Sequence, residues 1–400
     1  MHDPVRKVVV TGCGALAGGA GSVEEIWGEL LGDRMVDDTL PSLERLRELG
    51  EVPVADAAIL GRHQLLALAA VRMAWKQAGL PGEHNRLRGE GAKSRFAHFG
   101  CVSGSSTGGL VAMEEEFAMR QAKRFSPYSL TRWRNNAIGS AVSVAFGLGG
   151  SDFSLNAASA TGAQCVLLAA TLIRAGSIDA AVVVASDPLP SPMLREAMER
   201  NGSIAKTPDG RPLSAARSGM HPREGAGCVI LESSDHADRR GALALAEWDG
   251  GHTAGEAFHL MAPDPSAETL TDLLQQTLGS STRGPSGGVD WVSLHATGTP
   301  RFDAVEIGCI QRYFGQAFPW ITAVKRTTGH CLAASGVIEA AMLSHGLFVG
   351  DVPPWPDGVD PALGLEACRP SVAPLPRHAI QIGQGMGGVV VVNAFSRCGG

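Results

Sequence analysis

The sequence predicts an α/β protein in which helices cover the β-sheets. Short apolar segments that read as buried strands alternate with helical segments along almost the whole chain, and this alternation is typical of α/β folds. The alternation begins again after about residue 245, which indicates two similar halves, although no internal repeat is visible. The chain has 400 residues, more than one small core usually organises, so two domains or two halves are expected, 1–245 and 246–400.

The first half supplies its elements in a regular order. The segment SVEEIWGELLG is a helix because Ser22 can cap its first turn and Glu25 stands three residues later. RHQLLALAAVRMAWKQAGL has helical periodicity and ends at GLPG, which stops helices. The predicted strands are KVVVTGCG (7–14), FAHFGCVSGSS (96–106, running into a small-residue loop), SDFSL (151–155), AAVVVASD (180–187) and GCVILES (227–233), with a helix at VLLAATLIRAG (166–176).

The second half repeats the alternation. Strands are predicted at VDWVSLHATG (289–298, strand and loop) and GGVVVVNAFS (387–396), and helices at TLTDLLQQTLG (269–279) and SGVIEAAMLSHGLFVG (335–350). Two segments rich in proline and glycine, 281–288 and 351–361, are loops, and neither is long enough to link independent domains.

Composition and charge exclude several classes of partner and site. A net charge of −6 gives no reason to expect nucleic acid or an anionic membrane as a partner. No apolar run approaches the roughly 18 to 20 residues that span a bilayer, and MHDPVRKVVV lacks the apolar core of a signal peptide. The 8 cysteines are scattered singly, which suits reduced thiols rather than a zinc site or disulfides. A cytoplasmic location and no metal are expected.

One motif imitates a nucleotide site. VVVTGCGALA matches G-x-G-x-x-A after a strand, and Asp33 follows about twenty residues later. Asp33 stands at a helix end, however, with no second strand before it. A glycine turn that packs a strand against a helix explains the pattern better.

A stretch of small residues, NAASATGAQC (156–165), lies between a predicted strand and a predicted helix, with the hydroxyl of Ser159 in its middle. A tight strand-to-helix turn that exposes a nucleophile at a helix N-terminus has this composition. So does an ordinary turn with a capping serine. The residues by themselves leave both interpretations open.

Two histidines lie in loops rich in glycine and threonine. His295 stands in SLHATGTP, directly after a strand, and His330 stands in VKRTTGHCLAASG, before the last long helix. Strand ends are where sites form in α/β folds. Lys325 adds a cation five residues before His330. These three residues are therefore candidates for a site.

At these motifs the chain resembles the β-ketoacyl-acyl carrier protein synthases of the elongating type. The resemblance runs over essentially the whole chain and is carried, in the family's order, by KVVVTGCGALAGGAGSVEEIWGELLGDR, GSSTGG, AFGLGGSDFSLNAASATGA, DGRPLSAARSGMHPREGAGCVILE, HATGTPRFDAVE, VKRTTGHCLAASGVIEA and GQGMGG. It implies the thiolase fold, a five-layered αβαβα sandwich of two similar halves. It also implies substrates carried on the phosphopantetheine of an acyl carrier protein, with no other cofactor.

The resemblance assigns roles by position. His295 and His330 match the pair that holds a malonyl thioester carbonyl while carbon dioxide leaves, and Lys325 matches the supporting lysine. Substrate-binding positions are Thr297 and Thr299, which match threonines that contact the pantetheine arm, together with Gln384, Met386 and Glu339, the glutamate of GVIEA. The backbone N–H groups of Ser159 and Met386 would form the oxyanion hole.

Three departures from the family pattern put ordinary elongation in doubt. Ser159 stands where the family has its nucleophilic cysteine, and Cys165 is almost two helical turns further on. An alcohol needs a base within hydrogen-bond reach, and His330, or less favourably His295, is the candidate. Gln384 and Met386 replace phenylalanines of the C-terminal gate, and PLSAARSGM has serine and alanine where aspartates are common, while keeping Arg217.

These features predict a ketosynthase-like acyltransferase of a specialised polyketide or fatty-acid-type pathway, in which Ser159 accepts the acyl group. The alternative is a non-condensing subunit, like a chain-length factor, that shapes the tunnel of a catalytic sister; the retained histidines count against it. A serine hydrolase of another fold has no use for the two histidine loops. An introduced Cys→Ser change that traps an acyl complex also stays open.

Two kinds of partner are predicted. The family pairs through the strand before the nucleophile, here SDFSL, so a homodimer or a heterodimer with a ketosynthase-like sister is expected. An acyl carrier protein is typically acidic and could be steered by a basic cluster, although a solvated loop explains the same residues. The cluster consists of Arg120, Lys123, Arg124, Arg132 and Arg134.

Overall fold

The computed structural model describes residues 6–82, 87, 94–119, 125–280 and 288–399. Its strands are β1 (Val8–Ala17), β2 (Phe99–Gly104), β3 (Asp152–Leu155), β4 (Ala180–Asp187), β5 (Gly225–Ser233), β6 (Ala246–Gly255), β7 (Trp291–Ser293), β8 (Trp320–Thr322), β9 (His378–Gly385) and β10 (Val389–Ser396). Strands and helices alternate along the chain, as the sequence predicted.

The helices are α1 (Val23–Leu31), α2 (Leu43–Leu49), α3 (Val54–Ala57), α4 (Arg62–Gln77), α5 (Gly108–Ala118), α6 (Ser129–Trp133), α7 (Ala137–Phe146), α8 (Thr161–Arg174), α9 (Pro192–Arg200), α10 (Ser234–Arg239), α11 (Glu268–Ser280), α12 (Pro300–Phe314), α13 (Lys325–Thr328) and α14 (Ala334–Val349). Two short 3₁₀ turns follow at Pro361–Leu363 and Leu365–Cys368. None of the helices in the described ranges is both long and apolar enough for a membrane span.

The strands form one ten-stranded sheet in the order β3-β2-β4-β5-β1-β6-β10-β9-β7-β8. The five strands at one end precede residue 234, and the five at the other end follow residue 245. A short antiparallel pairing of β1 with β6, Val8 opposite Trp248, joins the two groups. The predicted division into domains at residue 245 stays a prediction.

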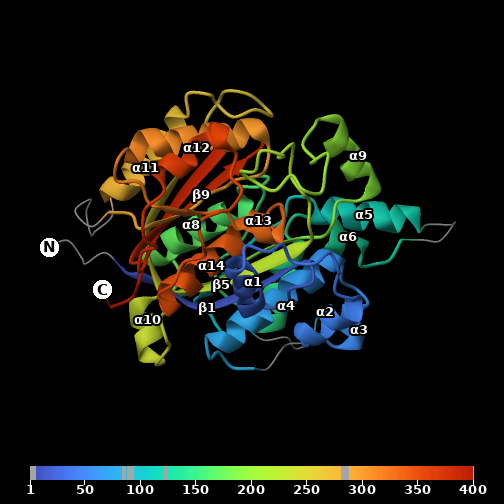
Figure 1. The fold of residues 1–400 in the computed structure, drawn as a ribbon. Coiled ribbons are helices and arrows are strands. Elements are labelled where there is room, and N and C mark those ends of the chain that lie inside the picture. Colours follow the sequence, from blue (N-terminus) through green and yellow to red (C-terminus); the bar gives the residue numbers. More distant parts are fainter. Residues whose placement is uncertain (1–5, 83–86, 88–93, 120–124, 281–287, 400) are drawn as a thin grey trace.

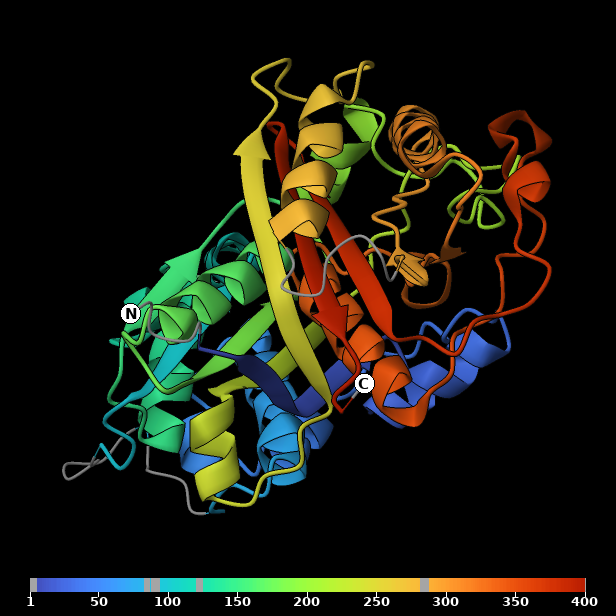
Figure 2. The ribbon, with the colours of Figure 1, turned by 90° about the vertical axis from the view of Figure 1, so that its left-hand side faces the viewer.

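The helices lie in layers around the two groups of strands. Helices α8 and α14 form the central layer, because each contacts strands of both groups. Helices α4 and α7 cover the outer face of the first group, and α11 covers the second, with α12 packed against α11. Figure 1 shows this order from bottom to top, and Figure 2 shows β6, β10 and β9 side by side with α11 on their outer face. The predicted α/β class with five layers is confirmed.

Small residues allow the layers to approach closely. A Cβ on Gly12 or Gly14 would lie 2.1 Å from a backbone oxygen of α4, so only glycine permits this packing. The G-x-G pattern therefore packs a strand against a helix, as predicted, although both glycines lie within β1 and not in a turn. Asp33 pairs with Arg211 and Arg326, at 2.7 and 3.0 Å. Its carboxylate has a structural role.

The predicted helix start at Ser22 is confirmed. The Ser22 hydroxyl accepts the N–H of Glu25 at 3.1 Å, and the Glu25 carboxylate accepts the N–H of Gly21 at 2.6 Å. Helix α8 begins earlier than predicted, at Thr161. This earlier start places Ser159 just before its first turn.

Candidate active site

Ser159 lies in a strained turn between β3 and α8. Ala158 has a φ of +49°, which a residue with a side chain rarely adopts. The Thr161 hydroxyl fixes this turn, because it accepts the N–H of Ala157 at 2.8 Å and donates to the carbonyl of Ala158 at 2.6 Å. Gly385 leaves room for it, since a Cβ there would lie 2.3 Å from the Ala157 oxygen. The serine is thus held at the N-terminal end of α8.

His295 and His330 meet from separate loops. Their ring centroids lie 6.0 Å apart with an interplanar angle of 86°, and both side chains are buried. His295 follows β7, and His330 lies between α13 and α14. The loops are far apart in sequence but adjacent in the fold, because β7 and β8 pair in parallel and end at the same edge.

Hydrogen bonds to Nδ1 set the tautomer of both histidines. The Leu332 N–H donates to Nδ1 of His330 at 3.0 Å, and the Lys325 ammonium lies 3.4 Å from Nδ1 of His295. A nitrogen that accepts a hydrogen bond carries no proton, so each neutral ring has its proton on Nε2. Burial, with the charge of Lys325 added, lowers the pKa of both rings well below 6.5. These contacts and pKa directions favour neutral rings that each carry an N–H at Nε2. The role of His330 as the base for Ser159 stays a prediction.

Lys325 pairs with Glu339 and contacts His295. The Lys325 ammonium donates to the Glu339 carboxylate and to the His295 carbonyl oxygen, the latter at 2.6 Å. Both side chains are only 1% exposed. Glu339 was expected to bind substrate, but it lies on α14 against Lys325 and is not part of the cavity wall. Glu339 therefore contacts the lysine and does not line the cavity.

Sequence reasoning missed two acidic residues that hold the HATG loop. Glu306 accepts the N–H groups of His295 and Ala296 at 2.7 and 2.8 Å, and Asp303 accepts the N–H of Gly298 at 3.0 Å. Burial raises the pKa of Glu306 to about 7. Both acids lie on the buried side of α12, and their spacing after the histidine in HATGTPRFDAVE was the available signal.

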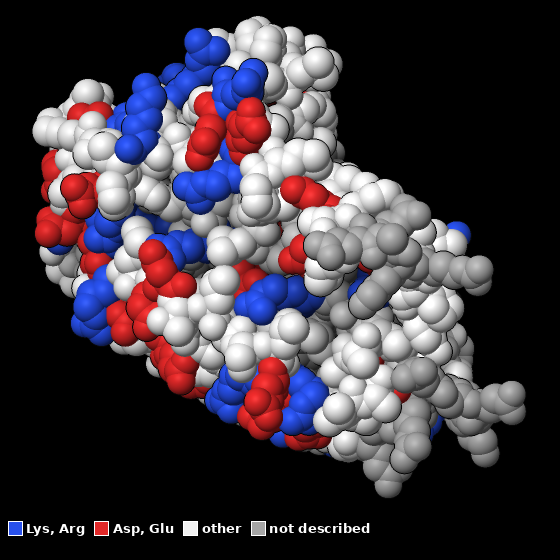
Figure 3. Space-filling model, turned by 90° about the vertical axis from the view of Figure 1, so that its right-hand side faces the viewer, with Lys and Arg blue, Asp and Glu red and all other residues white. Residues whose placement is uncertain are grey.

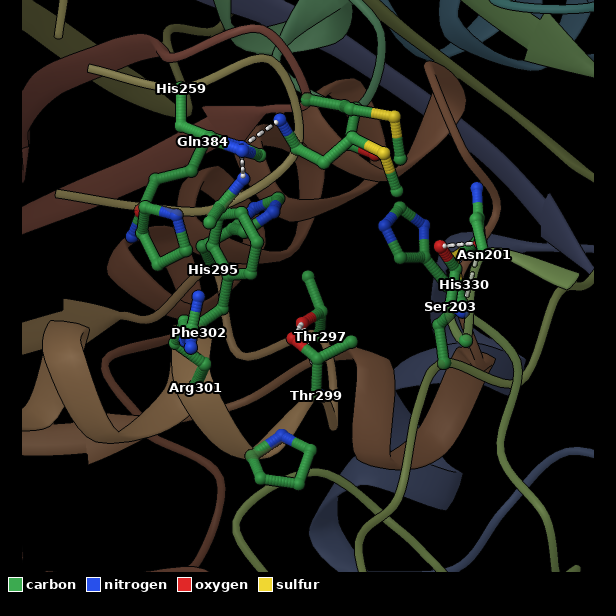
Figure 4. Close-up of a pocket in the computed structure, with 18 residues that line it drawn as sticks. Asn201, Ser203, His259, His295, Thr297, Thr299, Arg301, Phe302, His330 and Gln384 are labelled. Carbon is green, nitrogen blue, oxygen red and sulfur yellow. Dashed lines mark hydrogen bonds between the residues drawn. The ribbon is translucent and has the colours of Figure 1, made fainter. Parts of the chain in front are cut away.

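A cavity of about 520 Å³ brings most of the predicted site together (Figure 4). The predicted residues on its wall are Ser159, His295, Thr297, Thr299, His330, Gln384 and Met386. The Thr297 and Thr299 hydroxyls lie 2.7 Å apart, and Met386 is 45% exposed. Further wall residues come from the loop after β6 and from the start of α12. Within the described ranges, no cluster of three or more His, Cys, Asp or Glu side chains could hold a metal ion.

The donors and hydroxyls of this cavity suit a substrate with a polarised carbonyl. His295, His330 and Ser159 line one cavity, and the contacts at Nδ1 leave each ring an N–H at Nε2. Such preset donors stabilise negative charge that develops on a carbonyl oxygen. No hydrogen bond joins the Ser159 hydroxyl to either ring among the residues that the structure describes. The arrangement is therefore better suited to stabilising an enolate than to deprotonating the serine.

Family models match most of the chain. Residues 47–237 match the model described as Beta-ketoacyl synthase, N-terminal domain, and residues 245–357 match Beta-ketoacyl synthase, C-terminal domain. Nodulation protein E of Rhizobium meliloti (strain 1021) is 30% identical over 98% of this chain and 99% of its own length. The 3-oxoacyl-[acyl-carrier-protein] synthase 2 of Coxiella burnetii is 26% identical over 87% of each chain.

Solved structures share the fold. The ishigamide ketosynthase/chain length factor superposes with a TM-score of 0.82 at 25% identity, over 99% of this chain and 100% of that one. A Beta-ketoacyl synthase from Burkholderia phymatum STM815 gives 0.81 at 22% identity, over 98% and 99%. The thiolase-like fold that the sequence predicted is thereby confirmed.

Proposed function

Because the chain belongs to the β-ketoacyl synthase family, we propose that it is a ketosynthase-like acyltransferase acting on chains bound to an acyl carrier protein. The pathway would be a specialised one of polyketide or fatty-acid type. The proposal rests on one observation: Ser159, His295 and His330 line a single cavity, and both rings present an N–H donor.

The two histidines would act on a malonyl thioester. Their Nε2–H groups hold the thioester carbonyl oxygen, the bond to the carboxylate breaks, and carbon dioxide leaves. The electron pair of that bond becomes the enolate, whose oxygen the two donors stabilise. Neutral rings suit this step, because each Nε2–H hydrogen bond becomes stronger as negative charge develops on the thioester carbonyl oxygen.

Ser159 would receive the acyl chain as an oxoester: its oxygen bonds to the acyl carbon, the thioester bond to the carrier breaks, and the serine proton passes to the departing thiol. The enolate carbon then attacks that ester carbonyl, and the serine oxygen leaves and takes up a proton. An oxoester is a poorer acyl donor than a thioester, and no base contacts the hydroxyl in the described structure. Acyl transfer through Ser159 would therefore be slower than the loss of carbon dioxide.

Malonyl-acyl carrier protein tests the role of the histidines. The protein is expected to convert it to acetyl-acyl carrier protein, measured by mass spectrometry, and His295→Ala and His330→Ala are each expected to slow this conversion by about 10² to 10³. His98→Ala, at an exposed histidine, is the matched control and should leave the rate unchanged. Equal rates in all four proteins would contradict the assignment.

A chain-length-factor-like subunit is the second candidate. The ishigamide structure named above contains such a factor, and the absence of a base at Ser159 among the described contacts also favours it. This candidate predicts that changes at the dimer interface, and not at Ser159, alter the length of the product.

A partner subunit would pair along β3. Among the described residues this strand lies at the end of the sheet and pairs with β2 alone, so its other edge is open there, and Phe153 on it is 40% exposed. An open edge is a template for pairing with another chain. The partner is a second copy or a ketosynthase-like sister.

We expect the protein to sediment as a dimer at micromolar concentration, and Phe153→Asp to weaken that dimer at least tenfold. In a symmetric pair the substitution places two carboxylates in one interface and removes apolar contact from both sides. Phe258→Asp, at a 53% exposed residue of the loop after β6, is the control. A wild-type monomer would contradict pairing with itself and leave only a sister subunit.

The structure describes two residues of the predicted basic cluster, Arg132 and Arg134. Arg120, Lys123 and Arg124 lie outside the described residues, and Arg132 is paired with Glu116 at 3.4 Å. Figure 3 shows the face that carries α5, α6 and α9, where Lys and Arg are interleaved with Asp and Glu. Steering of an acidic carrier protein to this face stays a proposal.

A further inference from the structure

Asp187 is a buried carboxylate at the end of β4, outside the cavity. It is 0% exposed, and no Lys or Arg pairs with it among the described residues. A buried charge without a cation is costly unless hydrogen bonds compensate it. Its position therefore requires an explanation in terms of its contacts.

Its two oxygens accept hydrogen bonds from two separate loops. From the loop after β2 come the hydroxyl of Ser105 at 2.7 Å, the N–H of Ser106 at 3.0 Å, and the N–H and hydroxyl of Thr107 at 2.7 and 3.2 Å. From the loop after His330 comes the N–H of Ala333 at 2.9 Å.

These contacts place the carboxylate at the N-termini of two helices. Thr107 is the N-cap residue of α5 and Ala333 that of α14, and neither helix has a capping bond from its own N-cap side chain. The N-terminal ends of helices carry partial positive charge, which stabilises an anion. Asp187 thus caps both helices at once.

The contact to Ala333 fixes a strained turn beside His330. Leu332 has a φ of +48°, a conformation that costs free energy and that its surroundings must maintain. The N–H groups of the two consecutive residues point to different acceptors: that of Leu332 to Nδ1 of His330, and that of Ala333 to Asp187. Holding the second N–H in place therefore orients the first.

We propose that Asp187 is a positioning residue: it anchors the turn 331–333 so that the Leu332 N–H meets Nδ1 of His330 and the ring proton stays on Nε2. The catalytic consequence rests on the proposed function, since it assumes that the Nε2–H of His330 holds the substrate carbonyl. The effect on the ring itself does not depend on that assumption.

Asp187→Asn is the test, because it keeps the shape of the side chain but replaces one acceptor oxygen with an NH₂ group facing N–H donors. Histidine-selective ¹⁵N labelling, with His330 assigned through His330→Ala, reports the tautomer directly. The wild type is expected to show one tautomer, protonated on Nε2, and Asp187→Asn a mixture. Decarboxylation of malonyl-acyl carrier protein is expected to lose at least tenfold in kcat, with KM within twofold.

Two controls separate this role from general destabilisation. Glu232→Gln changes another buried carboxylate, which pairs with Arg240 at the opposite end of β5. Thr107→Val removes one hydroxyl that donates to Asp187 but leaves the hydrogen bond from Ala333 in place. Neither is expected to change the His330 signals. If Asp187→Asn does not fold, Asp187→Ser removes the carboxylate that accepts the Ala333 N–H and should give the same mixture.

An unchanged His330 spectrum in a folded Asp187→Asn or Asp187→Ser protein would overturn the inference, whatever the rate. A tautomer mixture with an unchanged decarboxylation rate would support the positioning role and instead overturn the proposed function of His330. The spectrum and the rate thus distinguish the two failures.

Discussion

Ser159→Ala is expected to abolish covalent acylation of the protein by acyl-carrier protein substrates while leaving its fold intact. The change removes the hydroxyl oxygen that would carry the acyl group in the proposed reaction. The Ser159 hydroxyl makes no hydrogen bond with a described residue, and the turn is fixed by Thr161. Intact-mass measurement after incubation with an acyl-carrier protein checks the result, and the unfolding curve checks the fold.

Ser159→Cys is the informative counterpart. Burial raises the pKa of the nearby Cys165 thiol, so that side chain is no substitute nucleophile, whereas a thiol at 159 would sit at the N-terminus of α8, where thiolates are stabilised. Condensation with a malonyl donor is expected to rise at least tenfold. Full pathway activity in Ser159→Ala would show that the serine is not a nucleophile and would favour the chain-length-factor-like subunit.

Lys325→Met is expected to lower the free energy of unfolding by about 3–5 kcal/mol, because it leaves the Glu339 carboxylate buried without its partner. It also removes the donor to Nδ1 of His295, so activity should fall with stability. The double variant Lys325→Met/Glu339→Gln is expected to recover a large part of the stability but not the activity. Urea unfolding followed by fluorescence measures the first quantity.

Lys7→Met provides the comparison for a pair at the surface. Lys7 lies 3.5 Å from Glu247, and its side chain is 59% exposed. Removing such a pair costs at most about 1 kcal/mol, since water screens both charges. If Lys325→Met were as mild as Lys7→Met, the buried pair would not be the support of the histidine loop that its contacts indicate.

The order of strands and helices along the chain could be predicted from the sequence, because it depends on local patterns of apolar and capping residues. Alternating apolar strands and periodic helices gave the α/β class, and the cap at Ser22 gave a helix start that the structure confirms. The start of α8 was harder to predict, because TGAQ has no strong start signal and the helix has no side-chain cap. Gly162 in its first turn packs closely against α14, a contact that the sequence does not reveal.

For the candidate site, the sequence predicted which residues take part but not how their side chains are oriented. Ser159, His295 and His330 stand in motifs that the resemblance made recognisable, and the structure brings them to one cavity. The resemblance predicted that Glu339 binds substrate, because a motif identifies the position of a residue but not the direction in which its side chain points. The side chain in fact contacts Lys325.

The sequence by itself determined the layered α/β fold and the short list of residues that face the cavity. Only the tertiary structure decided what those residues can do, because the state of each ring depends on contacts between segments distant in sequence. The Nδ1 of His295 is held by a lysine 30 residues away, and the turn that orients His330 is anchored by Asp187, 146 residues from Ala333. Hydrogen-bond direction arises from packing, and the contacts at Nδ1 leave the proton of each neutral ring on Nε2.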